Sequence, residues 1–135
     1  IDIVTASPYH PAGGVDGVPA YRLLFSKGAS LMYRILLDRH LHTYTAMYRA
    51  YRRDVVEQIK TTSDGFLMVT ELLVGALLAG YRVAEFPATL RVRRYGQSKA
   101  RVWQITRSHL RFQAQVLWRR ISTLGRATHH TRGTV

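Results

Sequence analysis

The chain has 135 residues, which suits one small domain, and 47% of them are hydrophobic, enough to build a core. It contains no cysteine, which excludes a disulfide-stabilised scaffold and a thiolate zinc site and fits a reducing compartment. Of its net charge of +12, the part from residue 91 onward contributes +11, because eleven Lys and Arg stand there without any Asp or Glu. An excess of positive charge confined to one end indicates a polyanionic partner, either anionic lipid, a phosphate ligand or nucleic acid.

The first third of the chain predicts a strand, a loop and a helix. Residues 2–7 are typical of a buried strand, and the Pro and Gly content of residues 8–17 predicts a loop. Pro19 suits a first helical turn, and apolar residues at helical spacing predict a helix that continues to about Leu37. The loop therefore leads into a helix N-terminus.

The middle of the chain continues the alternation. Residues 44–51 predict a short strand and residues 54–59 a helical turn. Residues 66–78 are apolar on nearly all sides, which is typical of a helix buried against a sheet. Residues 81–92 predict a strand with an edge position or a bend at Pro87. Alternating strands and helices predict an α/β fold.

Residues 99–124 predict a basic amphipathic helix, with an apolar flank beside a flank of five Arg. We expect Trp103 and Phe112 on the apolar flank to face a membrane, although the same flank could instead pack on the domain. Residues 125–135 lack periodicity and predict a disordered tail. The longest apolar run without charge, residues 72–81, is about half of what a membrane-spanning helix needs, so no span is expected.

Several short motifs, read in order, resemble those of the dolichol-phosphate mannosyltransferases and related polyprenyl-phosphate sugar transferases, which are family 2 glycosyltransferases. Each motif is weak alone, but their order and spacing from residue 2 to about residue 110 are specific. The motifs are Ile3–Tyr9 followed by Gly13-Gly14, Arg22 and Ser26, then Thr45–Arg53, Gly65-Phe66, Glu71–Leu73, Gly80–Pro87 and Arg93–Lys99.

The resemblance implies a partial nucleotide-sugar transferase sandwich of the A type. Residues 1–98 would be the C-terminal, acceptor-side part of the catalytic domain. The part that binds the nucleotide and carries an Asp-x-Asp motif for Mg²⁺ or Mn²⁺ has no counterpart here, and this chain holds no Asp-x-Asp and no expected metal ligand. We therefore expect the isolated chain to be inactive. The whole enzyme would move a sugar, with inversion, from a nucleotide sugar to a polyprenyl phosphate, working peripherally at the cytoplasmic membrane face.

The resemblance also implies binding residues. Arg22 and Ser26 stand four apart, hence on one helix face, and would bind the acceptor phosphate near a helix N-terminus that favours anions. Gly13 and Gly14 would form a glycine loop. A basic loop would close over the diphosphate, because cations and hydroxyls must offset the like charges of donor and acceptor. Its residues are Arg93, Arg94, Ser98 and Lys99.

Two positions depart from the family pattern. Pro8 stands where relatives often have Arg, which removes one expected phosphate ligand, and Thr43 stands where they usually have Asp. No catalytic residue is assigned, because a phosphate acceptor is already an anion and needs no general base. Glu71 and Glu85 are expected to be structural acids with partners, since a buried carboxylate needs one.

Two other functions remain open at this point. One is a family 2 glycosyltransferase that acts on a sugar or another hydroxyl acceptor. The other is a basic nucleic-acid-binding module, which the charge alone would allow. The aromatic residues of the basic segment lie at helical spacing among aliphatic ones, which favours packing or membrane burial over base stacking, so nucleic acid is not expected as a partner.

Overall fold

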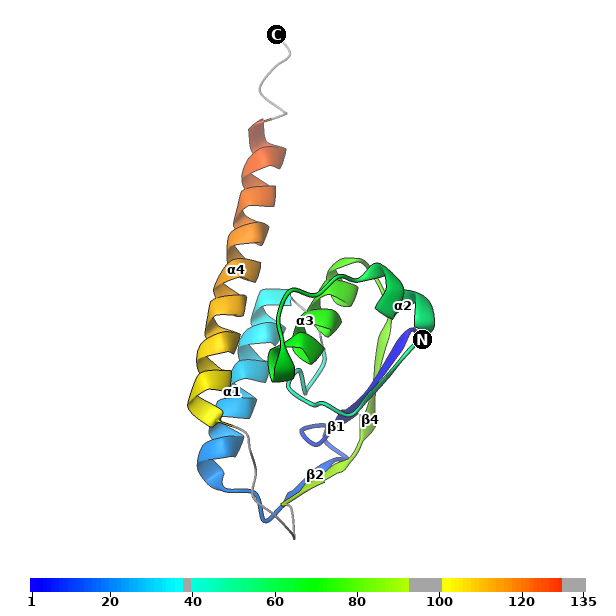
Figure 1. Ribbon diagram of the computed structural model, residues 1–135, viewed down its shortest axis with the longest axis vertical. Coiled ribbons are helices and arrows are strands. Elements are labelled where there is room, and N and C mark those ends of the chain that lie inside the picture. The colour runs from blue at the N-terminus through cyan, green and yellow to red at the C-terminus, as the bar shows by residue number, and fades with distance from the viewer. Residues whose placement is uncertain (38–39, 93–100, 130–135) are drawn as a thin grey trace.

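The computed structural model describes residues 1–37, 40–92 and 101–129. These residues form a mixed α/β structure (Figure 1). The mixed α/β class predicted from the sequence is confirmed, whereas the A-type sandwich stays a prediction. In chain order the elements are β1 (Ile3–Ser7), β2 (Gly14–Asp16), α1 (Ala20–Leu37), β3 (Arg49–Tyr51), α2 (Arg53–Gln58), α3 (Gly65–Leu78), β4 (Val83–Pro87), β5 (Thr89–Arg91) and α4 (Val102–His129).

There are two small sheets, and consecutive strands, β4 and β5, connect one to the other. In the larger sheet β1 lies between β3, to which it is antiparallel, and β4, to which it is parallel. The chain bends after Pro87 and continues as β5, which pairs in parallel with β2. At the bend the Ala88 N–H donates to the Ser7 carbonyl, and the Ala88 carbonyl accepts from the Gly14 N–H. The predicted bend at Pro87 is therefore confirmed, and it carries the chain from one sheet to the other.

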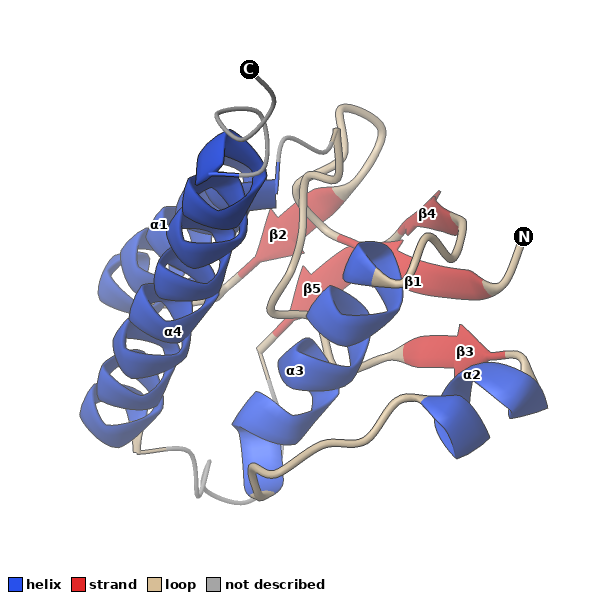
Figure 2. Ribbon diagram, turned by 90° about the horizontal axis from the view of Figure 1, so that it is seen from above, coloured by secondary structure: helices blue, strands red, loops and turns tan. Residues whose placement is uncertain are grey.

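The helices lie in layers beside the larger sheet. In Figures 1 and 2 α1 and α4 lie side by side, and α3 lies between this pair and the strands. Ile3, Thr5 and Ser7 of β1 are buried toward the helices, whereas Val4 is exposed on the other face. The hydrophobic core joins all these layers. Its buried members are Ile3, Tyr33, Leu37, Leu41, Tyr44, Val55, Leu73, Val74, Ala76, Leu77, Phe112 and Val116.

A buried arginine, Arg49, fixes the start of β3. Its guanidinium donates to the Thr5 hydroxyl (3.0 Å), the Val69 carbonyl (2.7 Å) and the Tyr44 carbonyl (2.5 Å). Burial lowers the pKa of this group, and the oxygen acceptors offset part of the cost of desolvation. The strand predicted over residues 44–51 forms only over residues 49–51, and at Tyr44 the backbone N–H donates to Ser30 while the carbonyl accepts from Arg49.

The glycine-containing loop predicted over residues 8–17 contains the short strand β2. Turn-forming residues do not exclude a strand of this length when a partner strand, here β5, supplies the hydrogen bonds. The helices expected near residues 19–37, 54–59 and 66–78 are all present.

The last helix corrects the prediction for Phe112. α4 packs on α1 and α3, and Phe112 is only 9% exposed, with its ring 6.2 Å from the ring of Tyr33. It therefore belongs to the core and cannot face a membrane. Trp103, on a different side of α4, is 70% exposed. The helix also continues to His129, so residues 125–129 are helical and not part of a disordered tail.

None of the helices in the described ranges is long and apolar enough to cross a membrane.

A buried histidine lies at the contact between α1 and α4. The Nδ1 atom of His109 hydrogen-bonds to the Tyr33 hydroxyl at 3.0 Å, and its ring lies edge-on to the Tyr33 ring. His109 is 5% exposed. Burial, with a smaller contribution from the charge of Arg49, lowers the pKa of His109 from 6.5 to about 4. The ring is thus neutral in the folded protein at neutral pH.

We predict that His109 makes folding sensitive to mild acid. The unfolded chain takes up a proton near pH 6.5 and the folded chain only near pH 4, so the free energy of unfolding should fall between these values by up to about 3 kcal/mol. Urea unfolding of wild type and His109→Gln from pH 7 to 4.5 measures this loss. The variant should lack most of the decline, and the exposed His40→Gln should keep it. Equal slopes in wild type and His109→Gln would contradict the prediction.

Candidate functional site

A cavity of about 1010 Å³, the larger of two described below, lies between α1, β5 and the first half of α4. Most of its wall is apolar, and none of the described residues that line it is Asp or Glu. Arg22 and Arg91 are its positively charged members. The cavity therefore combines an apolar trough with a cationic end. Its apolar side chains include Val18, Leu23, Phe25, Met32, Leu90, Val102, Ile105 and Leu110.

The structure places Arg22 and Ser26 together on the cavity side of α1. The helix starts directly after Pro19, whose carbonyl accepts hydrogen bonds from the N–H groups of Arg22 and Leu23. The Arg22 Nε donates to the Tyr21 hydroxyl at 3.3 Å, and no ion pair to Arg22 is formed within the described part of the chain. Arg22 is thus a cation in the first turn of a helix that has no acidic residue there.

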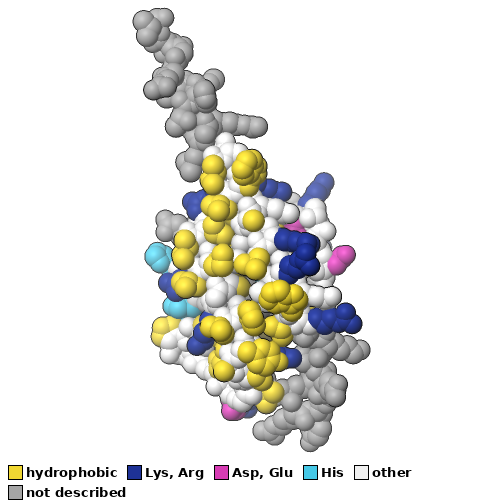
Figure 3. Space-filling model, turned by 90° about the vertical axis from the view of Figure 1, so that its left-hand side faces the viewer, with side chains coloured by type: hydrophobic (Ala, Val, Ile, Leu, Met, Phe, Trp, Pro, Cys, Tyr) yellow, Lys and Arg dark blue, Asp and Glu magenta, His cyan; other side chains and the backbone are white. Residues whose placement is uncertain are grey.

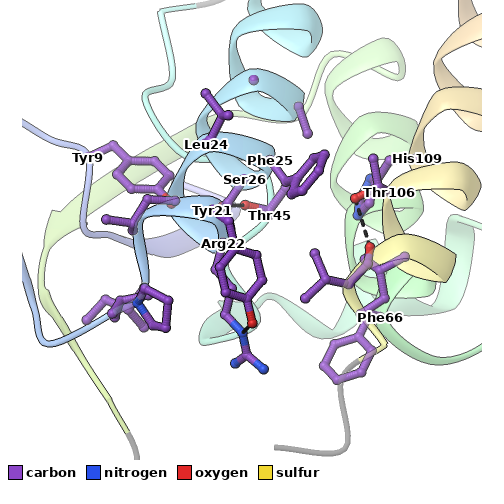
Figure 4. A pocket seen from close by; sticks show the side chains of 18 of the residues that line it. Tyr9, Tyr21, Arg22, Leu24, Phe25, Ser26, Thr45, Phe66, Thr106 and His109 are labelled. Carbon is purple, nitrogen blue, oxygen red and sulfur yellow. Dashed lines mark hydrogen bonds between the residues drawn. The ribbon is translucent and has the colours of Figure 1, made fainter.

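Three hydroxyl groups meet beside Arg22. The Ser26 Oγ lies 2.6 Å from the Thr45 Oγ1, and Ser26 also acts as a hydrogen-bond donor toward the Tyr9 oxygen. Figure 4 shows Ser26 and Thr45 next to each other, with Tyr9 on one side and Phe66 and His109 across the cavity. Burial raises the pKa of Tyr9, and the bond from Ser26 offsets part of that rise. We call Tyr9, Ser26 and Thr45 the hydroxyl cluster.

A second cavity, of about 490 Å³, lies at the carboxyl ends of β1 and β4. Its wall includes Ala6 of β1, Pro8 directly after β1, and Ala88 and Thr89 after β4. In open α/β sheets ligands bind outside the carboxyl ends of the strands. The two cavities share five lining residues, which include the whole hydroxyl cluster, so they meet there. The shared residues are Tyr9, Ser26, Thr45, Met47 and Leu90.

Glu85 of β4 holds the loops that carry this cluster. One carboxylate oxygen accepts from the Ser7 hydroxyl (2.8 Å) and from the backbone N–H groups of His42 (2.8 Å) and Thr43 (3.0 Å), and the other lies 2.6 Å from the His42 Nδ1. Burial alone would raise the pKa of Glu85, but these hydrogen bonds outweigh it and lower the pKa. Glu85 is therefore a buried anion with all its partners in place.

A chain of hydrogen bonds leads from Glu85 through Ser7 and Thr43 to Tyr9 at the second cavity. Since the Ser7 hydroxyl donates to Glu85, it can accept from the Thr43 hydroxyl at 2.8 Å, and the Thr43 oxygen in turn accepts from the Tyr9 N–H at 3.4 Å. Thr43, which stands where relatives usually have Asp, is thus buried in a structural chain of hydrogen bonds.

The expectation that Glu71 and Glu85 are partnered acids is confirmed. The Glu71 carboxylate accepts from the Thr62 N–H and hydroxyl and from the Ser63 N–H. Backbone N–H groups, hydroxyls and one histidine serve as partners for the two acids.

Gly13 and Gly14 line neither cavity. A Cβ at Gly13 would lie 2.5 Å from the Ser7 carbonyl oxygen, too close for any side chain. Gly14 begins β2, and its N–H binds Ala88. The glycines therefore let the loop fold back on β1, and their prediction as a ligand-binding loop has no support in this geometry.

Neither Trp103 nor Phe112 is brought to the cavities. Trp103 lines neither of them, and Phe112 is in the core. The basic loop of Arg93, Arg94, Ser98 and Lys99 lies outside the described residues.

Sequence reasoning missed Tyr9, Thr45 and the clamp formed by Glu85. Tyr9 and Thr45 stand inside motifs that carry the resemblance, and their membership of those motifs was the available signal. The hydrogen bonds from Glu85 join residues about 40 and 80 positions apart, which no local pattern reveals.

The described residues do not suit a divalent metal ion. No group of three or more His or acidic side chains among them could hold one, and neither cavity has a carboxylate in its described wall. Mg²⁺ prefers carboxylate oxygens, which are absent from these walls. The Mg²⁺ or Mn²⁺ expected for the whole enzyme would need ligands from outside the described residues.

No family model matches the chain. Curated proteins do match it. It is 40% identical over 101 residues to the polyprenol monophosphomannose synthase of Mycolicibacterium smegmatis, an alignment that covers 73% of this chain and 38% of that protein. It is 35% identical over 100 residues to the dolichol-phosphate mannosyltransferase of Pyrococcus furiosus, covering 73% of this chain and 28% of that protein.

The chain thus spans well under half the length of these relatives. Identity at this level over most of the chain agrees with the ordered motifs of the sequence. The resemblance stated from those motifs is therefore confirmed: over 73% of its length the chain is a homologue of the dolichol-phosphate mannosyltransferase-like family 2 glycosyltransferases.

Proposed function

We propose that this chain forms the acceptor side of a glycosyltransferase that moves a mannosyl group, with inversion, from a nucleotide sugar to a polyprenyl phosphate. The names of both relatives support the sugar and the acceptor class. The structural observation that carries the proposal is the larger of the two cavities, in which an apolar trough ends at Arg22 and Ser26.

The trough suits a prenyl chain. Its volume of about 1010 Å³ is at the upper end of the roughly 300–1,000 Å³ that is usual for small-molecule sites. The apolar side chains of α1 and α4 would bury the first isoprene units next to the phosphate, at about 25 cal/mol for each Å² removed from water. A soluble sugar hydroxyl acceptor would gain nothing from such a wall, so the trough favours the lipid acceptor over the hydroxyl alternative.

The cationic end suits the phosphate. A positive side chain in the first turn of a helix is unfavourable beside the positive end of the helix dipole, unless an anion binds there as well. Arg22 occupies that place without an ion pair in the described ranges, and Ser26 offers a hydroxyl one turn later. Both groups can donate charge-assisted hydrogen bonds to phosphate oxygens, the strong kind of hydrogen bond.

Arg22 and Ser26 would bind and orient the acceptor phosphate. The acceptor phosphate is an anion at neutral pH, so its oxygen can attack the anomeric carbon without a general base. Arg22 and Ser26 would hold the other phosphate oxygens and reduce repulsion from the donor diphosphate. A divalent ion bound elsewhere in the enzyme would stabilise the leaving diphosphate.

We predict that Arg22→Ala weakens use of the acceptor. Loss of a charge-assisted bond costs about 1.5–3 kcal/mol, so kcat/KM for polyprenyl phosphate should fall about 10- to 100-fold in the whole protein, with little change in KM for the nucleotide sugar. The matched control is Arg34→Ala, which removes a charge from the same helix outside both cavities. An equal loss for donor and acceptor, or no loss, would refute the assignment of Arg22.

We also propose that the outer faces of α1 and α4 dock on an anionic membrane surface. Figure 3 shows hydrophobic side chains along almost the whole of this face, with Lys and Arg beside them. On α1 Leu24 and Ile35 are 72% and 70% exposed, and on α4 Trp103 is 70% exposed. The helices carry no Asp or Glu over residues 20–37 and 102–123. The sequence predicted membrane contact for residues 99–124 alone, and this proposal adds α1 to the membrane-facing surface.

The surface lies beside the cavity that would receive the lipid. Leu24 and Leu110, both exposed on this face, also line the trough. A bilayer at this face would thus place the acceptor next to its binding site. Burial of apolar side chains in the acyl boundary and attraction of Arg to anionic headgroups, about 1 kcal/mol each, would act together.

We predict that liposome binding depends on both contributions. In sedimentation the chain should bind vesicles that contain phosphatidylserine, and less at high salt. Ile35→Gln combined with Trp103→Gln should lower the partition coefficient at least tenfold, because roughly 1–2 kcal/mol of apolar burial is lost at each site. Neither residue lines a cavity. Val56→Gln on α2, 53% exposed, is the control and should bind as wild type does. A wild type that ignores anionic vesicles at low salt would rule out docking.

A further inference from the structure

The larger cavity has a second cation to which the acceptor assignment gives no role. Arg91 of β5 and Arg22 of α1 are the Lys or Arg residues among its described lining. The Arg91 side chain is 71% exposed, and its Nε lies 3.9 Å from the Oδ2 of Asp16 on β2, beyond hydrogen-bond distance. An exposed and loose ion pair of this kind adds little to stability. Arg91 can therefore exchange Asp16 for another anion at low cost.

The fold brings Arg91 to the N-terminus of α1, where Arg22 lies. Asp16 and Arg91 are partners at the end of the parallel pair β2–β5, and directly after it the Val92 N–H donates to the Asp16 carbonyl at 3.0 Å. The chain turns from β2 toward α1 at Gly17, where φ is 67°, and a Cβ there would lie 3.0 Å from the Val92 Cγ1. The strand that carries Arg91 is thus anchored five residues before Arg22, and both side chains line the same cavity.

The charge of the proposed ligand favours a second cation at this end of the trough. A phosphate monoester has a second pKa of about 6, so it carries about −1.5 to −2 at neutral pH. Arg22 offsets one of these charges, and the neutral hydroxyl cluster offsets none. Excess negative charge beside an apolar wall is costly, so a second positive side chain at the phosphate is favourable.

We propose that Arg91 is a second ligand of the acceptor phosphate, and that Asp16 competes with the phosphate for it. Arg91 pairs with Asp16 until the ligand arrives, and then donates to phosphate oxygens together with Arg22. This inference rests on the proposed function, because it adds a residue to the same acceptor site. It also assigns an acidic residue that opposes binding.

Soluble probes test this assignment without a membrane, so that lipid headgroups cannot contribute. Farnesyl phosphate carries both a prenyl chain and a phosphate, and farnesol carries the prenyl chain alone. Titration calorimetry on the 135-residue chain measures the Kd of each. Wild type should bind farnesyl phosphate more tightly than farnesol, because only the phosphate engages the two arginines.

Substitutions at Arg91 separate phosphate binding from the shape of the wall and from net charge. Arg91→Ala should raise the Kd for farnesyl phosphate about five- to tenfold and leave the Kd for farnesol unchanged, because only a charge-assisted contact is lost. Arg91→Lys should keep most of the affinity, since it retains the charge but not the forked geometry. The matched control is Arg53→Ala, which removes an exposed Arg at the start of α2, outside both cavities, and should bind as wild type does.

Asp16 gives a test in the opposite direction. Asp16→Asn should lower the Kd for farnesyl phosphate about two- to fourfold, because it frees Arg91 and removes a nearby negative charge. In an Arg91→Ala background the same substitution should gain less, since only the removal of the negative charge remains. A purely structural role of Arg91 would not produce this coupling.

The results that would overturn the inference differ from one another. If wild type does not prefer farnesyl phosphate to farnesol, the proposed acceptor site is wrong and this inference with it. If wild type prefers it but Arg91→Ala binds it equally well, the acceptor site stands and the role of Arg91 is refuted. Arg91 is also refuted as a ligand if Arg91→Ala weakens both probes alike, or if Arg53→Ala weakens farnesyl phosphate as much. An Asp16→Asn variant that binds no more tightly than wild type refutes the competition with Asp16.

Discussion

The site depends on one buried carboxylate. Glu85 ties β4 to β1 through the Ser7 hydroxyl and to the loop before β3 through two backbone N–H groups. An anion in this position is stable only while every one of these donors is present, because an unpaired buried carboxylate costs several kcal/mol. Three separate segments are thereby held in one arrangement. The walls of both cavities, and the hydroxyl groups between them, follow from it.

Much of the fold could be predicted from local pattern. Helical spacing of apolar residues located α1, and the apolar run of residues 66–78 located α3. The misses came from long-range contacts. The backbone at Tyr44 binds Arg49 and Ser30, and β2 forms only because β5 lies beside it. Phe112 was placed on a membrane face because the sequence cannot say which neighbour an amphipathic helix will have.

The site was predictable only in part. The helical spacing of Arg22 and Ser26 correctly placed them on one face, and the structure adds the apolar trough beside them. Resemblance supplied Gly13 and Gly14 as a ligand loop, whereas their contacts with β1 and β4 explain them by chain packing alone. Thr45 was quoted as part of a motif but received no role, since its bond to Ser26 links helix and loop across 19 positions.

The shared wall of the two cavities has a thermodynamic consequence. Because Tyr9, Ser26 and Thr45 face both spaces, any ligand that reorients their hydroxyls on one side changes the surface offered on the other. Binding free energies at the two cavities are then coupled, and the coupling is reciprocal: the factor by which one occupant alters the affinity of its neighbour applies equally in reverse. Cooperativity between two ligands would thus arise within a single small domain, from the turning of three O–H bonds.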